Sequence, residues 1–175
     1  MLQPLAARLR SAPSDTELAL LRVAHRQNLP TLIVHVAAST GVFAATWRQA
    51  PAWSIAWLAA VLIVCLVRLS VHLHLGRALD QAPPPGRPVR TWATAHAVGL
   101  IFSAGLWVVL VIARLPGADV QSAMTIVIVI SALSGGAIGV LAPLLITGRI
   151  YVSLLLLPAS ALLLVGGQPI LGILG

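Results

Sequence analysis

The chain has 175 residues, of which 59% are hydrophobic and only 9% charged, and its mean hydropathy is +0.99. Soluble domains carry roughly 25% charged residues, so this composition indicates a membrane protein. The formal charge is +7 without a single lysine, and the arginines are scattered singly at the ends of apolar runs, which favours membrane anchoring over nucleic-acid binding.

The first 28 residues form a polar leader, which we expect on the cytoplasmic side. Ser14 and Glu17 fit the S-x-x-E capping box, in which the two side chains satisfy free amides at the start of a helix. Apolar residues then follow at helical spacing. We therefore expect a short amphipathic helix on the membrane surface that runs into the first span.

The remainder, residues 29–175, is predicted to be an all-α polytopic transmembrane bundle. Apolar runs of sufficient length predict five complete spans and the start of a sixth, at about 29–46, 52–75, 92–113, 120–141, 150–165 and 169–175. The last run reaches only about 9 Å as a helix, so we interpret it as a span cut short. A native five-span protein with an interfacial tail is the alternative.

The arginine distribution predicts the orientation. The leader, the loop at 76–90 and the loop expected around Arg149 carry most of the arginines, whereas Arg48 and Arg114 stand alone on the other side. Because cytoplasmic loops are enriched in basic residues, we expect a multi-pass protein of the bacterial inner membrane with a cytoplasmic N-terminus.

Small residues recur at helical spacing in the third and fourth spans, and we expect them to let neighbouring helices approach closely. They are Gly99 and Ser103 in the third span and Ser131, Gly135, Gly136 and Gly139 in the fourth. The fourth span is therefore predicted to be the central packing helix. Pro158 lies within the fifth span, where it is expected to produce a kink.

Arg68 is the most informative single residue, because an ionisable group inside a span is costly and marks a functional candidate. It lies about two turns before the expected end of the second span. Its side chain is long enough to reach the inner headgroups, so snorkelling or structural pairing is one interpretation. Binding of an anionic group is the other.

Four histidines, His35, His72, His74 and His96, are predicted to lie in the same cytoplasmic half of the bundle, and His35, His72 and His96 are the candidates for ligand binding. His72 follows Arg68 by four residues, so the two share a helix face. A proton-sensitive polar cluster and ordinary interfacial histidines both fit this placement. The spacing does not indicate a metal or haem site, and no cofactor is expected.

The second half of the chain carries a pattern of tryptophans, small residues and prolines at helix ends. It consists of Trp92, His96, Gly99, 103–107, 131–143, Arg149, Tyr151 and Pro158. This pattern resembles the N-terminal membrane input module of bacterial signalling proteins, where similar segments precede histidine kinase or diguanylate cyclase domains. The resemblance implies a sensor that works as a homodimer. It assigns no ligand residue and no enzyme activity to this segment.

Three hypotheses for the function follow. The first is the sensory input module of a signal-transduction protein, which would sit in the lipid bilayer and respond to a small amphipathic or anionic ligand. The second is a small stand-alone transporter or permease-like protein, although no acidic residue lies within a span and no clear internal repeat is present. The third is a membrane redox or metal protein that uses His35, His72 and His96.

Overall fold

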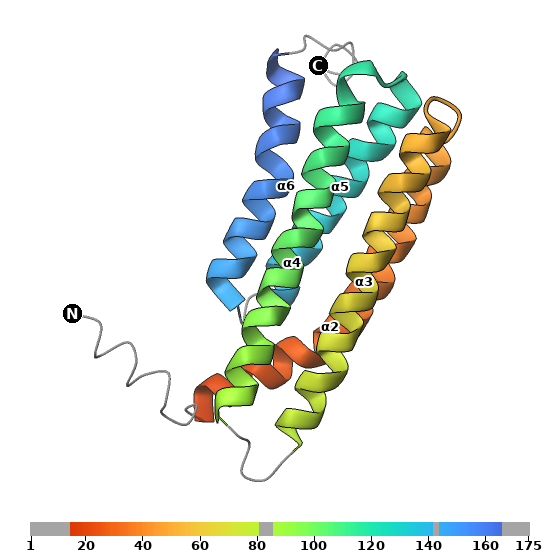
Figure 1. The fold of residues 1–175 in the computed structure, drawn as a ribbon. Helices are drawn as coiled ribbons and strands as arrows, with labels where there is room; N and C mark the ends of the chain where they lie inside the picture. Colours follow the sequence, from red (N-terminus) through yellow and green to blue (C-terminus); the bar gives the residue numbers. More distant parts are fainter. Residues whose placement is uncertain (1–14, 81–85, 142–143, 166–175) are drawn as a thin grey trace, which may run out of the picture.

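The computed structural model describes residues 15–80, 86–141 and 144–165, and these ranges are helical apart from short turns. They form an up-and-down bundle of long helices (Figure 1). The helices are α2 (Asp15–Thr46), α3 (Pro51–Leu79), α4 (Gly86–Arg114), α5 (Val120–Val140) and α6 (Leu145–Val165), with a 3₁₀ turn η1 (Leu115–Gly117) between α4 and α5. Each α-helix is long and apolar enough to cross a membrane. Such helices satisfy their backbone hydrogen bonds internally, which a bilayer requires.

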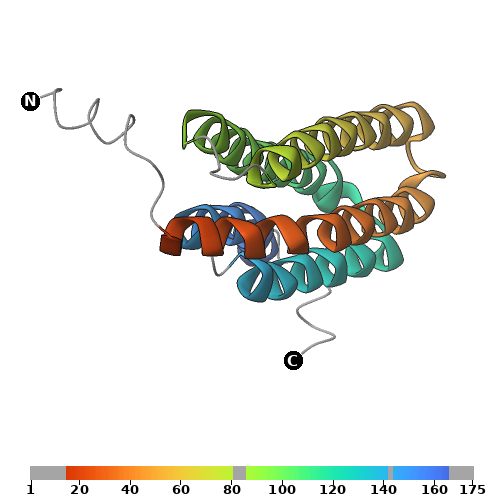
Figure 2. The ribbon, with the colours of Figure 1, turned by 90° about the horizontal axis from the view of Figure 1, so that it is seen from below.

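The five helices form a closed ring. In order around the ring, α2 packs on α3, α3 on α4, α4 on α6, α6 on α5, and α5 returns to α2. Seen along the bundle, α3 and α4 lie on one side and α2 and α5 on the other (Figure 2). The chain therefore closes its ring through a contact between the first and the fourth α-helix, which are distant in sequence.

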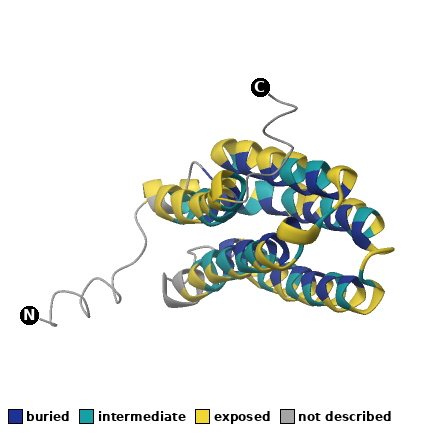
Figure 3. Cartoon of the chain, turned by 90° about the horizontal axis from the view of Figure 1, so that it is seen from above, coloured by how far each residue is buried: buried dark blue, intermediate teal, exposed yellow. Residues whose placement is uncertain are grey.

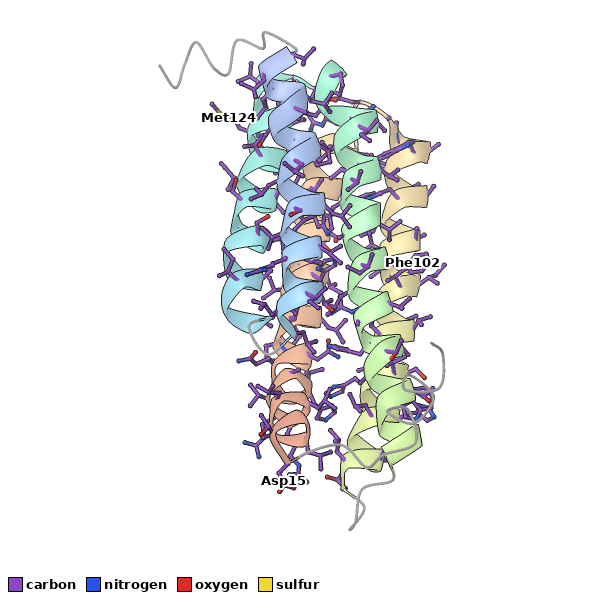
Figure 4. The ribbon with its side chains drawn as sticks, turned by 90° about the vertical axis from the view of Figure 1, so that its left-hand side faces the viewer. Asp15, Phe102 and Met124 are labelled. Carbon is purple, nitrogen blue, oxygen red and sulfur yellow. The ribbon has the colours of Figure 1, made fainter. Side chains whose placement is uncertain are left out.

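The outer surface of the ring is apolar. Buried residues form stripes that face the bundle interior, and exposed residues face outward (Figure 3). Phe102 of α4 illustrates the outward face: its ring projects away from the bundle (Figure 4) and is 65% exposed. Large apolar side chains are exposed on every helix, and soluble proteins rarely expose so much apolar surface to water. This surface therefore indicates a multi-pass membrane protein.

The helices extend beyond several predicted boundaries. The leader helix and the first span are one continuous helix, α2, which contains Pro30. The prediction of a loop around Arg149 is wrong, because α6 begins at Leu145 and includes both Gly148 and Arg149. Arginine is a good helix former and a single glycine costs only about 1 kcal/mol relative to alanine, so neither residue interrupts this apolar helix. Ser14 of the capping box and the expected sixth span at 169–175 lie outside the described residues.

The prediction that α5 is the central packing helix is also wrong. Its buried face consists of larger residues at helical spacing, among them Ile126, Ile130 and Leu133. The small residues Ser131, Gly135, Gly136 and Gly139 are exposed instead. A side chain on any of these three glycines would meet nothing within 4 Å. Burial of the large residues decides which face turns inward, and α5 occupies the side of the ring between α2 and α6.

Pro158 lies inside α6 as predicted and is half-buried. The helix continues through it to Val165. The kink that it is expected to cause stays a prediction.

Polar side chains link the α2–α3 turn to the α4–α5 connection, at the end of the bundle opposite the leader. Asp119 caps α5, because its carboxylate accepts a hydrogen bond from the Ser122 amide at 2.7 Å. Gln49 donates to Asp119 and to the Ser122 hydroxyl, and it accepts from Arg114 at 2.9 Å. The α2–α3 turn is thus tied to both ends of the η1 connection.

Asp119 predicts a pH-dependent contribution to stability. The hydrogen bond from the Ser122 amide, above all, holds the pKa of this carboxyl below its ordinary value of 3.8. A lowered pKa means that the contribution is present above this ordinary value and is lost as the pH falls through the lower folded-state value. We expect Asp119→Ala to lower the melting temperature at neutral pH, with a difference from wild type that shrinks in acid. Thermal unfolding of the two proteins across pH measures this, and a difference independent of pH would contradict it.

Candidate functional site: a buried arginine centre

Arg68 lies in the interior of the bundle. It belongs to α3, about three turns before the end of that helix at Leu79. Only 1% of its surface is exposed. Snorkelling is therefore wrong: α3 is longer than predicted, and the side chain turns into the ring instead of reaching for headgroups. Structural pairing, the other part of that interpretation, fits the hydrogen bonds of Arg68 inside the bundle.

Two neutral side chains hold the Arg68 guanidinium. Its Nη1 donates to the Ser103 hydroxyl of α4 at 3.1 Å. Its Nη2 donates to the side-chain amide oxygen Oδ1 of Asn28 in α2, also at 3.1 Å. Ser103 in turn donates to the Gly99 carbonyl one turn earlier, at 3.0 Å. A single side chain thus ties together α2, α3 and α4.

Gly99 provides the space for this arrangement. A methyl group at its Cα would lie 2.9 Å from Arg68 Cγ, closer than real carbon contacts. What approaches closely at Gly99 is the stem of an arginine side chain; the close approach of helix backbones expected at Gly99 and Ser103 stays a prediction. The glycine leaves room for the stem, and the serine accepts from its head.

The centre has an excess of hydrogen-bond donors. Among the side chains that the structure describes, Arg68 has no carboxylate partner, and its hydrogen bonds go to Ser103 and Asn28. The Arg68 Nε and the Asn28 Nδ2 are both buried without a partner. A buried charge is normally paired, and an unpaired buried donor is unfavourable by roughly 1–3 kcal/mol. Within the described residues, the positive charge of Arg68 is therefore left without a counter-ion, and two donors beside it are left without an acceptor.

His35 lies in the same interior, next to Trp107. The Trp107 indole N–H donates to His35 Nε2 at 2.9 Å, and the two rings meet edge to face at 5.7 Å. Since an indole can only donate, Nε2 is the unprotonated nitrogen of a neutral imidazole and Nδ1 carries the hydrogen. That Nδ1 is buried and has no partner within the described chain.

The remaining predicted histidines lie towards the leader end of the same interior. His96 is buried, and the Arg68 charge acts on it as well as on His35. His72 stacks on His25 with ring centres 4.0 Å apart. The structure therefore brings His35 and His96 near Arg68, whereas His72 pairs mainly with His25.

Sequence reasoning missed Asn28, His25 and Trp107. A signal for Asn28 was present, because Asn28, His35 and Ser39 follow one another at spacings of seven and four residues along an apolar helix. All three are buried. Polar residues at that spacing share one face, so they mark the side of α2 that turns away from lipid.

Within residues 15–80, 86–141 and 144–165, no group of three or more histidine, cysteine or acidic side chains is placed to hold a metal ion. Cys65, one turn before Arg68 on α3, is a buried free thiol.

Comparisons of the chain with protein-family models, curated proteins and solved structures gave no match. The feature of this chain that bears on its function is therefore the buried centre at Arg68.

Gly99 offers a test of the arginine centre. We expect Gly99→Ala to lower the free energy of unfolding by about 1–3 kcal/mol. The added methyl group would push the stem of Arg68 aside, while hydrogen bonds hold the guanidinium of the same side chain in place. Gly105→Ala is the matched control: it lies on the same helix and its methyl group would meet nothing within 4 Å. Unfolding of both variants in detergent micelles measures the difference. Equal stability of the two variants would contradict the close approach at Gly99.

Proposed function

We propose that this chain is the membrane-embedded sensory input module of a bacterial signal-transduction protein, and that its receptor site is the Arg68 centre. The ligand is a small anion or the anionic group of an amphipathic molecule. The observation that carries this proposal is a buried guanidinium with only neutral partners and with unsatisfied donors beside it. The resemblance of 92–158 to input modules supplies the signalling context.

The chemistry of the centre favours oxyanions. A guanidinium presents its N–H groups in a planar fork that matches carboxylate, sulfonate or phosphate oxygens. Arg68 Nε and Asn28 Nδ2 are buried and have no partner within the described chain, so an oxyanion that enters the centre would find two donors that are not engaged with Ser103 or Asn28 Oδ1. In a medium of low dielectric constant, a charge-assisted hydrogen bond is stronger than in water.

The proposed signal is a shift between two packings of α2, α3 and α4. Arg68 joins these three helices through single hydrogen bonds, so an anion that draws the guanidinium to itself changes what holds them together. A ligand shifts such an equilibrium only by its difference in affinity for the two states. An output domain of the kinase or cyclase type, working as a dimer, would read the changed arrangement.

Arg68→Gln tests the receptor site. The purified chain in lipid nanodiscs is titrated with sodium methanesulfonate at constant ionic strength, and tryptophan emission reports on Trp107 and its surroundings. We expect a saturable change for wild type and an affinity at least about tenfold weaker for Arg68→Gln, since the buried charge is lost.

Arg149→Gln is the matched control, because it removes the same charge from an exposed position on α6, and it should bind like wild type. Equal titrations of wild type and Arg68→Gln would contradict the proposal. Uptake of labelled methanesulfonate into proteoliposomes decides between the two hypotheses from the sequence. Saturable binding without uptake supports the sensor, whereas Arg68-dependent uptake would replace it with a transporter.

The arginine distribution supports a cytoplasmic N-terminus, and labelling of single cysteines tests it. In a Cys65→Ala background, we expect Arg77→Cys to react with a membrane-impermeant maleimide only after the cells are opened. Arg48→Cys should react in intact cells, because the two exposed positions lie at opposite ends of α3 and its turn. The opposite pattern would reverse the orientation, and labelling of both from one side would contradict the span itself.

A further inference from the structure

A cavity of about 150 Å³ lies between α2 and α5, on the lipid-facing side of the ring. Its walls include Pro30, Thr31 and His35 of α2, Ala132 and Gly136 of α5, and Tyr151 of α6. Arg68 is not among the lining residues, so this cavity is a separate feature from the arginine centre.

Two sequence features create the space. Pro30 has no amide hydrogen, and its ring clashes with the preceding turn, so it bends or disturbs a helix at its position. The Thr31 hydroxyl adds to this by bonding back to the Gln27 carbonyl at 2.7 Å, a contact that also bends helices. In Figure 1 the first turns of α2 lean away from the rest of the helix. Opposite this point α5 presents Ala132 and Gly136, which are too small to fill the gap.

The cavity is open to the bilayer at its small residues. Ala132 and Gly136 are both exposed, and a side chain placed on Gly136 would meet nothing within 4 Å. A molecule dissolved in the bilayer therefore reaches the cavity sideways, between α2 and α5, without passing through water.

One residue that lines this apolar cavity has a ring nitrogen without a partner in the described chain. His35 is only 1% exposed, and its Nε2 is occupied by the Trp107 indole. The tautomer that follows places a hydrogen on Nδ1, which is buried and unpartnered. The other lining residues are mostly aliphatic. The lining thus combines apolar contact with neutral polar groups: the unpartnered His35 Nδ1, the Tyr151 hydroxyl, and the Thr31 hydroxyl that bonds to Gln27.

We propose that this cavity binds a small, uncharged, lipid-soluble molecule of about one ring in size that carries one acceptor oxygen, to which His35 Nδ1 donates. The volume matches the size: an engineered protein cavity of about 150 Å³ holds a benzene ring. A neutral donor such as His35 Nδ1–H matches a carbonyl or ether oxygen, and the apolar wall disfavours a charged ligand. This inference goes beyond the anion site at Arg68 and does not depend on it.

A pair of ligands of nearly equal shape tests the donor. Acetophenone carries a carbonyl oxygen where α-methylstyrene carries a methylene group. The chain in nanodiscs is titrated with each, and the side-chain N–H signal of ¹⁵N-labelled histidine is followed by NMR. We expect acetophenone to shift the His35 Nδ1–H signal saturably and to bind at least about fivefold more tightly than α-methylstyrene, as one net hydrogen bond provides.

A pair of glycine variants tests the place. Gly136→Leu fills the cavity and should weaken acetophenone binding at least about tenfold. Gly139→Leu is the matched control, since Gly139 is equally exposed on α5, has equally open space and does not line the cavity. It should bind acetophenone like wild type. Methanesulfonate titration of Gly136→Leu reports whether the arginine centre is intact, so the two proposals fail separately.

Three results would overturn the inference. Equal binding to Gly136→Leu and wild type would mean that acetophenone only partitions into the bilayer. Equal binding of both ligands would mean that His35 donates to neither. Absence of any saturable signal would mean that the cavity binds neither ligand.

Discussion

A guanidinium buried without a carboxylate is the constraint on which the rest of the bundle depends. Desolvating such a charge costs several kcal/mol even after the surroundings relax. The described structure offsets this cost only with neutral oxygens, one from α2 and one from α4. The ring must therefore hold three helices at the distances that these bonds require. Gly99 is part of the same constraint, because a larger residue would displace the stem of Arg68.

The interior combines two kinds of polarity that differ in what they can bind. At Arg68 the unsatisfied donors accompany a charge, which favours an anion. At His35 the unsatisfied donor belongs to a neutral ring in an apolar wall, which favours a neutral acceptor. Both lie on the inner face of α2, through Asn28 and His35, so one helix carries a residue of each site.

The sequence sufficed for the class of fold, because length and hydropathy decide where a chain crosses a bilayer. It also sufficed to single out Arg68, since a charge within an apolar run is conspicuous. It did not show where that side chain points: that depends on the end of α3 and on Asn28, a residue distant in the chain. The fourth span was misread because small residues can line an interface or an open surface. Only the position of the larger Ile126, Ile130 and Leu133 decides between the two.

The order of helices around the ring has a consequence for how the protein is made. The residues that satisfy Arg68 come from α2 and α4, which flank α3 in the chain, so the first three helices contain the whole arginine centre. Because synthesis proceeds from the N-terminus, the buried charge and both of its partners are made before α5 and α6. The wall that α5 gives to the cavity is added only afterwards. In the order of synthesis, the costly group and its partners thus come first, and the helix beside the opening toward lipid comes later.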